Sequence, residues 1–239
     1  MNSKSTVTSG YIVKKSDVQE TLASLYLRLN GYFVSGFIVH DAEQVKTEMD
    51  LLAVRFPHHE EPEREIRCCP YLSPPDNRTD FIIGEVKGGS RDLGFNPRFH
   101  EDPDAIRTVL RRIGAFSSND IDLICREVPK RLSPENNPKS APLPNFVVSD
   151  GSAQIRFMVF AMEQTRTKED TSPYLCGSDA LRYAWTCFRP GQKRAECATR
   201  YNFNLWGPLF TPTVRYFKDK ADRSPETMSD LYALHGVTD

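Results

Sequence analysis

The first part of the chain alternates between helical and extended hydrophobic patterns. Apolar positions in residues 17–30 recur at helical spacing, which predicts a helix capped by Ser16 or Asp17. Later runs are rich in β-branched and aromatic residues, which predicts strands. These strands are expected at 32–39, 49–56 and 81–86. The chain should therefore begin with a helix that leads into three strands.

The remainder of the chain repeats both patterns. Helical spacing or capping residues predict four helices, at 103–113 (capped by Asp102), 119–132, 178–188 (capped by Ser178) and 225–234 (with Pro225 at its first position). Two further strands are expected at 145–149 and 155–162, the second of them buried on both faces. The aromatic region 198–216 fits no single pattern.

Two polar segments interrupt these elements. Residues 57–78 are rich in His, Glu, Pro and Asn, which predicts a long surface loop that buries little. A loop of this length is uncommon without a function, so it is a candidate flap over a site or a partner contact. Residues 133–144 are rich in proline and form the best internal boundary.

Composition narrows the class of protein. The chain has 239 residues, 39% hydrophobic and 26% charged, with a formal net charge of -1, as expected for a soluble globular protein. This balance excludes an overall cationic polymer-binding protein, although not a local basic groove. No stretch approaches the roughly 18 apolar residues that cross a bilayer. The polar start lacks the apolar core of a signal peptide, so a cytoplasmic location is expected.

The six cysteines show no CxxC spacing and are expected to be reduced, mostly buried thiols. Cys68-Cys69 and His58-His59 share the long polar loop, which leaves a zinc site there as an alternative.

Two pairs of charged residues interrupt the predicted strands. Glu48 and Asp50 precede the apolar run 51–54, and Glu85 and Lys87 end the run that starts at Phe81. Side chains alternate along a strand, so each pair should project from one face. A charge among apolar neighbours is costly unless it is paired or metal-bound. The pattern predicts that two carboxylates and an ammonium converge at adjacent strand ends.

Glu-x-Lys alone is a weak signal, because it arises by chance roughly once in a chain of this length. A structural salt bridge is therefore the alternative reading of Glu85 and Lys87. Position gives the motif its weight. It ends an apolar strand, it follows another strand that carries an acid, and Gly88-Gly89 after it permits close backbone approach.

This order of residues resembles the PD-(D/E)xK nuclease superfamily, the restriction-endonuclease-like fold shared with archaeal Holliday-junction resolvases. Glu20 lies on the first helix, about three helical turns before Gly31-Tyr32, and is followed by Asp50 and then by Glu85-x-Lys87. The resemblance covers roughly residues 16–90. It implies an α/β fold with a mixed central sheet flanked by helices in αβββαβ order. On this reading residues 1–165 form the nuclease-like core and residues 166–239 form a C-terminal helical extension packed on it.

The resemblance also implies roles. Asp50 and Glu85 would bind Mg²⁺ or Mn²⁺ together with the backbone carbonyl of Val86, Glu20 would bind the ion directly or through water, and Lys87 would orient or activate the attacking water. A hard cation prefers such oxygen ligands and lowers the pKa of a bound water. An ammonium close by steadies the charge that develops on the phosphate.

The sequence departs from the family pattern in two places. Met49 stands where the family's proline is expected. Glu20 lies opposite the main apolar stripe of its helix, on the side of Ala23 and Leu27, and is solvated if only one face of that helix packs on the sheet. Glu48 could take its place or add a ligand, although an exposed carboxylate at a strand edge is the ordinary alternative.

Phosphate contacts would require positive charge beside these acids. Five arginines follow the Glu-x-Lys strand and are candidates, of which Arg91, Arg107 and Arg111 are favoured and Arg98 and Arg112 are additional. Arg107 and Arg111 share one helix face at i, i+4 spacing. Arginines on a helix surface are more often simply solvated. Lys193-Arg194 is a weaker candidate at a loop tip.

The expected function is a metal-dependent endonuclease that hydrolyses phosphodiester bonds. DNA rather than RNA is the expected substrate, because most members of the superfamily act on DNA. No helix-turn-helix or zinc-finger signature indicates base readout, so a homodimer or a partner protein could supply specificity, as in prokaryotic defence or repair systems. The alternative is a non-catalytic nucleic-acid-binding or protein-interaction module on the same fold. No Walker loop, GxGxxG or GxSxG motif supports another α/β enzyme.

Overall fold

The computed structural model describes residues 13–40, 45–62, 66–72, 77–89, 93–97, 101–132, 144–167, 173–189, 206–220 and 223–237. Among them, six strands form one mixed sheet. The strands are β1 (Phe33–His40), β2 (Val45–Arg55), β3 (Thr79–Lys87), β4 (Asn145–Val147), β5 (Ala153–Ala161) and β6 (Leu175–Cys176). β1, β2 and β3 pair antiparallel in chain order, and β5 lies parallel to β3. β4 pairs antiparallel and β6 parallel with β5, and the order across the sheet is β1-β2-β3-β5-β4.

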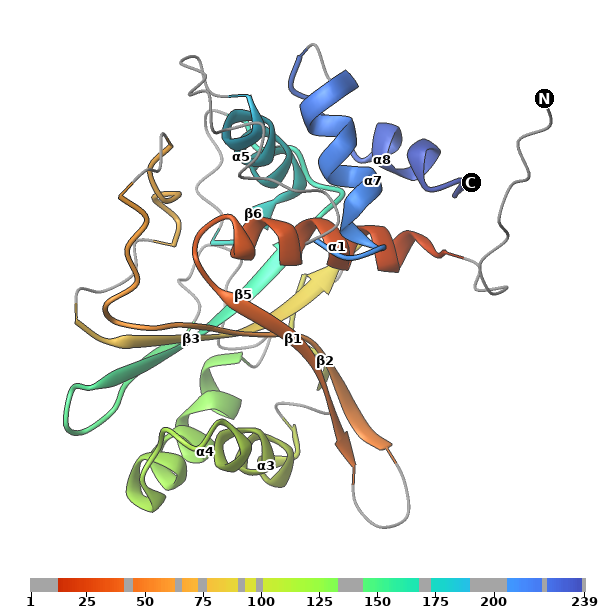
Figure 1. The fold of residues 1–239 in the computed structure, drawn as a ribbon. Coiled ribbons are helices and arrows are strands. Elements are labelled where there is room, and N and C mark those ends of the chain that lie inside the picture. The colour runs from red at the N-terminus through yellow and green to blue at the C-terminus, as the bar shows by residue number, and fades with distance from the viewer. Residues whose placement is uncertain are drawn as a thin grey trace.

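Helices cover both faces of this sheet (Figure 1). One face carries α1 (Lys15–Arg28), α5 (Gly177–Phe188), α7 (Phe210–Arg215), the π-helical turn η2 (Tyr216–Lys220) and α8 (Ser229–Leu234). The other face carries α3 (Pro103–Ile113) and α4 (Ser118–Leu132), which connect β3 to β5. A crossover of this kind is required between parallel neighbours. The predicted α/β class, a mixed sheet flanked by helices, is confirmed.

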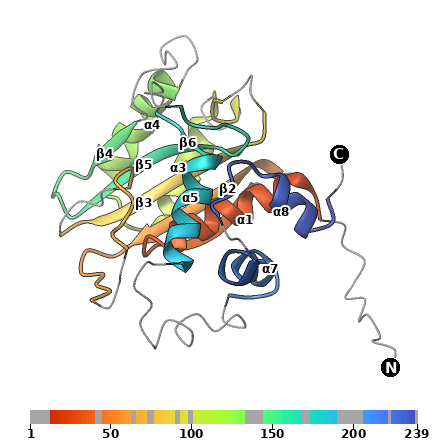
Figure 2. The same cartoon turned by 90° about the horizontal axis from the view of Figure 1, so that it is seen from above.

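Each face of the sheet has its own hydrophobic core. The first core joins α1 to the sheet and to the C-terminal helices. These helices lie beside α1 in the view from above (Figure 2). The second core joins the sheet to α3 and α4. β3 and β5 are buried along most of their length because each lies between these two layers, as expected for β5.

Helix α1 is buried on more than the one stripe that its sequence predicts. Leu22 and Leu25 face the core as expected, but Ala23 and Leu27, on the supposed outer side, are also fully buried. The second side is covered because α5, α7 and α8 pack against α1 from the far end of the chain. The sequence of α1 alone carries no sign of these distant partners.

Several helix ends differ from prediction. α3 begins as expected, with the Asp102 carboxylate accepting a hydrogen bond from the Asp104 amide. The N-cap of α1 is Lys14, and Asp17 instead accepts a hydrogen bond from the Lys14 amide at 2.7 Å. The N-cap of α5 is Cys176 rather than Ser178, and α8 begins at Ser229 rather than at Pro225. Capping residues are abundant near helix starts, so composition alone does not choose among them.

The polar loop after β2 buries more than its composition predicts. Its described residues, 57–62, 66–72 and 77–78, form no helix or strand. Leu72 and Cys69 nevertheless belong to the core beneath α1, and the Cys69 amide donates to the Asn30 side chain at 2.8 Å. Two apolar side chains thus anchor this segment to the end of α1.

A buried ion pair lies at the start of β3. Asp80 has no exposed surface and accepts hydrogen bonds from Tyr32 before β1 and from Gln154 and Arg156 of β5. Arg156 also donates to the Leu72 carbonyl at 2.8 Å. The Asp80 carboxylate and Arg156 therefore tie the loop after β2 to β3, to β5 and to the residue before β1. The only sign of this in the sequence is an acid beside an apolar run.

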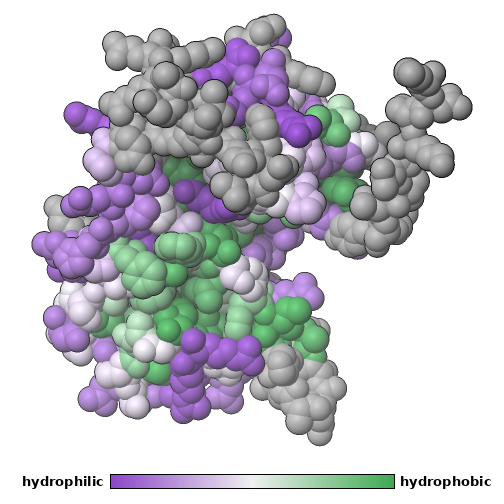
Figure 3. Space-filling model, in the orientation of Figure 1, coloured by the Kyte–Doolittle hydropathy of each residue, from purple (hydrophilic) through white to green (hydrophobic). Residues whose placement is uncertain are grey.

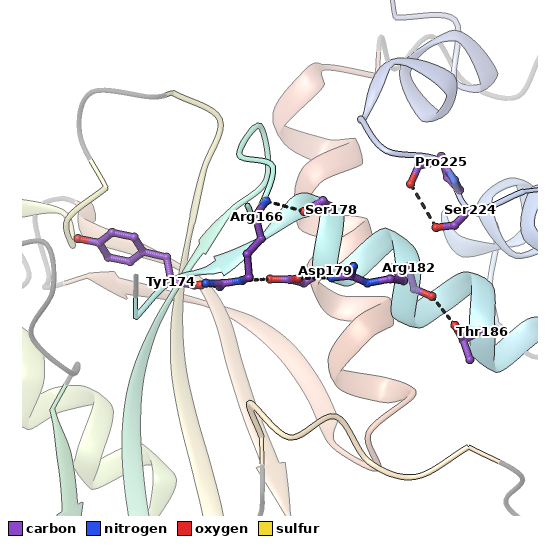
Figure 4. Close-up of polar contacts among 8 residues, drawn as sticks. All are labelled: Arg166, Tyr174, Ser178, Asp179, Arg182, Thr186, Ser224 and Pro225. Carbon is purple, nitrogen blue, oxygen red and sulfur yellow. Dashed lines mark hydrogen bonds and ion pairs between the residues drawn. The ribbon is translucent and has the colours of Figure 1, made fainter. Parts of the chain in front are cut away.

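A second ion pair fixes the junction between β5 and α5 (Figure 4). Arg166 Nε lies 2.6 Å from Asp179 Oδ2, and Arg182 reaches the other oxygen of Asp179 at 2.7 Å. Gly177, the first residue of α5, lies so close to the main chain after β5 that an added Cβ would be 1.9 Å from the Met162 carbonyl oxygen. Only glycine fits there without movement of the backbone.

No helix among the described residues is both long and apolar enough to span a bilayer. The five cysteines within the described part of the chain form no disulfide, and Cys197 lies outside it.

Candidate active site

Asp50 lies at an irregularity in the pairing of β1 with β2. Ser35 pairs with Leu52 and Phe37 pairs with Met49, so the single residue Gly36 faces both Asp50 and Leu51. This is a β-bulge, which changes the direction of the side chains at one point of a strand. Met49 accordingly joins the core beneath α3 and α4, whereas Leu51 joins the core beneath α1. Regular alternation would have placed both on one face.

The ladder between β2 and β3 is also interrupted beside Asp50. Regular pairing runs from Arg55 with Asp80 to Leu51 with Gly84. Beyond it, the Asp50 side chain, rather than a backbone carbonyl, accepts a hydrogen bond from the Val86 amide at 2.7 Å. The two strands therefore part at this point, with the Asp50 carboxylate between them.

Glu85 and Lys87 share one face of β3, as predicted. Lys87 Nζ lies 2.9 Å from Glu85 Oε1, and the two side chains are 21% and 10% exposed. Their face is that of Ile83, which packs beneath α3 and α4, because Ile82 and Val86 on the alternate positions belong to the other core. The main-chain amide of Asn96, just before α3, also hydrogen-bonds to Glu85.

Burial raises the pKa of both carboxyl groups above the usual range. For Asp50, the cost of desolvation exceeds the lowering effect of the Val86 amide and of the Lys87 charge. For Glu85, desolvation likewise exceeds the effect of Lys87, and the nearby Asp50 charge raises the pKa further. Asp50, Glu85 and Lys87 are thus close enough to influence one another. The Lys87 charge and the main-chain amides stabilise the two carboxylates only in part.

Glu20 approaches this group from α1. Burial raises the pKa of Glu20 to about 7, and the negative charges of Asp50, Asp17 and Glu48 contribute to the rise. Glu20 is therefore half-buried beside Asp50, and the prediction that it would be solvated if only one face of α1 packed does not apply. Glu85 and Lys87 project from the other face of the sheet, because alternation along β3 places them with Ile83 in the core of α3 and α4.

The expected convergence is therefore only partly found. Asp50, Glu85 and Lys87 come together, but Glu20 meets only the Asp50 end of the group. Within the described ranges, no three His, Cys, Asp or Glu side chains form a group that could hold a metal ion. Cys68-Cys69 and His58-His59 in the loop after β2 are among the described residues, and they form no such group either.

The oxygen set around Asp50 still fits a small, hard cation. Mg²⁺ is commonly bound through one or two carboxylates, with water and substrate phosphate completing its ligands. Asp50 and Glu85, with the main-chain carbonyl of Val86 next to Glu85 in sequence, provide such a set. Their raised pKa values indicate that a positive charge at this point would stabilise the ionised forms.

A polar pocket of about 640 Å³ lies beside Gly88, just past the ends of the parallel strands β3 and β5, and is lined by residues of α1 and α8. Gln19 is one of its lining residues, and a Cβ on Gly88 would lie 2.6 Å from Gln19 Oε1. Gln19 donates to Glu163 at 3.0 Å and to the Tyr232 hydroxyl at 2.6 Å. No sequence pattern indicates Gln19, although Gly88 after Glu85-x-Lys87 predicts a close approach to the backbone.

Three of the predicted basic residues lie on α3. Arg107 and Arg111 are on α3, where Arg107 pairs with Asp122 at 2.6 Å and Arg111 is exposed. Arg112 lies over the ring of Phe37 in β1, 4.7 Å from its centroid. Arg91, Arg98 and Lys193-Arg194 fall outside the described residues. A role for Arg107 or Arg111 in phosphate binding stays a prediction.

Comparisons with known proteins found no match to any family model, curated sequence or solved structure.

The elevated pKa of Glu20 predicts a pH-dependent loss of stability. Between the ordinary pKa of 4.5 and about 7, the folded protein binds more protons than the unfolded chain, so the free energy of unfolding falls as pH rises through this window. Glu20→Gln should therefore be more stable than the wild type at pH 8 by about 1 kcal/mol, a value that allows for solvent screening, and equal to it near pH 4. Urea unfolding at both pH values measures this difference.

Exposed Glu226 provides the control variant, Glu226→Gln, for that measurement. A Glu20→Gln variant no more stable than the wild type at pH 8 would show that Glu20 is not held in a desolvated, acidic environment.

Proposed function

We propose that this chain is a metal-dependent nuclease that hydrolyses phosphodiester bonds, with DNA rather than RNA as its expected substrate. The observation that carries the proposal is the meeting of Asp50, Glu85 and Lys87 at the point where β2 and β3 part. Desolvation of two carboxylates and an ammonium at adjacent strand ends destabilises the fold. Ionic pairing with Lys87 offsets this cost only in part.

The chain order supports a restriction-endonuclease-like core. Helix α1, strands β1 to β3, helices α3 and α4, and strand β5 follow one another as the αβββαβ pattern requires, with β4 inserted before β5. The three acidic and basic positions lie on the central strands β2 and β3 of this set, with Glu20 on the first helix.

Asp50, Glu85 and the Val86 carbonyl would hold Mg²⁺ or Mn²⁺, which supplies charge stabilisation at the phosphate and lowers the pKa of bound water. Lys87 lies 2.9 Å from Glu85 in the structure. When the cation binds Glu85, the Lys87 ammonium would instead stabilise the charge on the scissile phosphate. Glu20, with a pKa of about 7, can accept or release a proton at neutral pH next to Asp50.

The test is direct. Purified protein is incubated with supercoiled plasmid, linear duplex, single-stranded DNA and RNA in Mg²⁺ or Mn²⁺, and in EDTA. We expect metal-dependent cleavage of at least one DNA form, and its loss in Asp50→Asn purified in the same way. Equal degradation by both proteins would indicate a contaminant. No cleavage of any substrate by folded protein would favour the non-catalytic binding module.

A further inference from the structure

The edge strand β1 is open along its outer side. Among the described residues, β1 pairs with β2 alone, and no strand pairs with its other edge. Every second residue of an edge strand turns its backbone N–H and C=O groups outward. Proteins often protect such an edge with lysine, proline or an inward-pointing charge. Residues 33–40 contain no lysine, proline or acid, so this edge can pair with another extended chain.

A second pocket, of about 570 Å³, follows the first half of this edge on the side of α1. Its lining includes residues 31–36, which form the start of β1 and the turn before it, and Ser24 and Arg28 of α1. Trp206 and Phe210 also line it and pack on the core beneath α1. The volume is in the range of roughly 300–1,000 Å³ typical of binding clefts. A chain that paired with β1 would therefore lie along a hollow beside α1.

The pocket holds a cation without a carboxylate partner. The Arg28 guanidinium lies over the rings of Trp206 at 4.4 Å and Phe210 at 4.7 Å, and donates to the Trp206 carbonyl at 3.4 Å. Burial lowers the pKa of Arg28, and no acid within the described part of the chain offsets this effect. Glu61, the one acid among the described lining residues, lies 3.4 Å from His59 Nε2. The pocket therefore favours a ligand that brings a carboxylate to Arg28.

Aromatic side chains are exposed beside the same edge on the opposite face of the sheet. Val34 packs on the core beneath α1, so alternation places the Phe33 ring on the face of α3 and α4. Phe33 is 64% exposed and Phe56 is 55% exposed, and their ring centroids lie 5.9 Å apart. Figure 3 shows an apolar surface over β1 and β2 at the front of the molecule. Contiguous apolar surface of this kind marks interaction sites.

We infer that β1 binds an extended segment of a partner protein as an additional strand, in which acidic residues alternate with apolar ones. The side chains of a strand alternate between its two faces. Acidic side chains on one face reach Arg28, and apolar side chains on the other face cover Phe33. Main-chain hydrogen bonds to the outward groups of β1 supply the rest of the affinity, as in other recognition by strand addition. The interaction uses none of Asp50, Glu85 and Lys87, and it does not depend on the proposed nuclease function.

The unpaired cation favours a partner segment over a second copy of this chain. Two β1 strands from two copies could pair along their open edges. Residues 33–40 contain no acid, however, so a second β1 brings no carboxylate to Arg28 in either orientation. A segment that alternates acidic and apolar residues meets the requirements of both faces.

Fluorescence polarisation with labelled peptides tests the inference on the purified full chain in EDTA. We expect binding of a peptide of alternating glutamate and valine, as long as the eight residues of β1. Two other peptides should bind about 10-fold more weakly, the factor expected for loss of a charged hydrogen bond. One has glutamine in place of glutamate, and the other has all its glutamates before its valines. No binding of the alternating peptide up to about 1 mM, or equal affinity for all three, overturns the inference.

Arg28→Gln should weaken binding of the alternating peptide about 10-fold and leave the affinity for the glutamine peptide unchanged. The matched control is Arg131→Gln. Arg131 also lies over a ring, 4.9 Å from the centroid of Phe146, but Phe146 is in β4 at the opposite edge of the sheet. Phe33→Ala should weaken binding of both peptides, because it removes apolar contact without changing charge. Equal binding by the wild type and Arg28→Gln overturns the inference.

Hydrogen exchange distinguishes strand addition from attraction of charge alone. The alternating peptide should slow amide exchange in residues 33–40, because the outward N–H groups of β1 become hydrogen-bonded. Binding without slower exchange in this segment contradicts strand addition. Light scattering without peptide reports a second copy as the occupant. A dimer that dissociates in Phe33→Ala and is not displaced by the peptide would assign β1 to that interface and overturn the inference.

Discussion

Asp50→Asn is expected to lower the rate of phosphodiester cleavage by about 100- to 1,000-fold, the cost of removing one charge-stabilising group from an active site. The asparagine can still accept the Val86 amide hydrogen bond that Asp50 accepts at 2.7 Å, so the strands should keep their arrangement. It cannot supply the negative charge that a cation needs. Addition of Mn²⁺ should therefore raise the melting temperature of the wild type but not that of Asp50→Asn.

Lys87→Ala should lose cleavage to a similar extent but retain the metal-dependent rise in melting temperature. Without the ammonium at 2.9 Å, the pKa of Glu85 should rise further, because Lys87 lowers it in the wild type. The acidic limb of the pH profile of any residual activity should then move to higher pH. A purely structural ion pair would change stability and leave that profile in place.

The matched control for Lys87 is Lys130→Ala on α4. Lys130 makes a similar pair with Glu127 at 3.1 Å, but its side chain is 60% exposed. The Lys130→Ala variant should cleave nucleic acid at the rate of the wild type. If Lys130→Ala lost as much activity as Lys87→Ala, or if neither Lys87→Ala nor Asp50→Asn lost any, the site assignment would be wrong.

Asp80→Ala is expected to destabilise the fold by about 3–5 kcal/mol, the cost of leaving one member of a buried ion pair without its partner. Asp80 is fully buried, and the side chain of Arg156 is only 14% exposed, so water cannot replace the lost carboxylate. Tyr32 and Gln154 would lose a hydrogen-bond acceptor as well. Because small domains are stable by only about 5–15 kcal/mol, urea unfolding should show a large fall in the midpoint.

Asp122→Ala provides the control for Asp80. It removes an aspartate from an arginine pair at 2.6 Å, but Asp122 is 61% exposed and its loss should cost less than about 1 kcal/mol. Asp80→Leu combined with Arg156→Met and Tyr32→Phe removes both charges and the Tyr32 hydroxyl together. This triple variant should recover much of the stability lost in Asp80→Ala. Similar losses for Asp80→Ala and Asp122→Ala would contradict the role given to burial.

Local signals sufficed where a structure depends on neighbours in sequence. Asp102 and Pro103 set the start of α3, and the apolar runs around Ile83 and Phe157 placed two central strands. The period of two along β3 also predicted that Glu85 and Lys87 share a face. These features follow from capping, ring-constrained backbone and side-chain alternation, which act over a few residues.

The unpredicted features depend on partners far away in the chain. The bulge at Asp50 exists only when β1 is paired beside β2, with Gly36 opposite it. The environment of Glu20 depends on α5, α7 and α8, which cover the second side of α1. The burial of Asp80 requires Arg156 from β5. Sequence patterns within β2, α1 or β3 carry no trace of these contacts, so the facing of the acids was the least predictable part of the site.

The parallel pairing of β3 with β5 has a consequence for the order in which the chain is made. Thr79 pairs with Ala153 and Lys87 pairs with Ala161. β3 therefore emerges from the ribosome long before its parallel partner β5. Until then, an apolar strand that carries Glu85 and Lys87 presents an open edge, the kind of surface on which nascent chains associate. The site residues thus acquire their final setting late in folding, because closure of this long connection must precede the pairing.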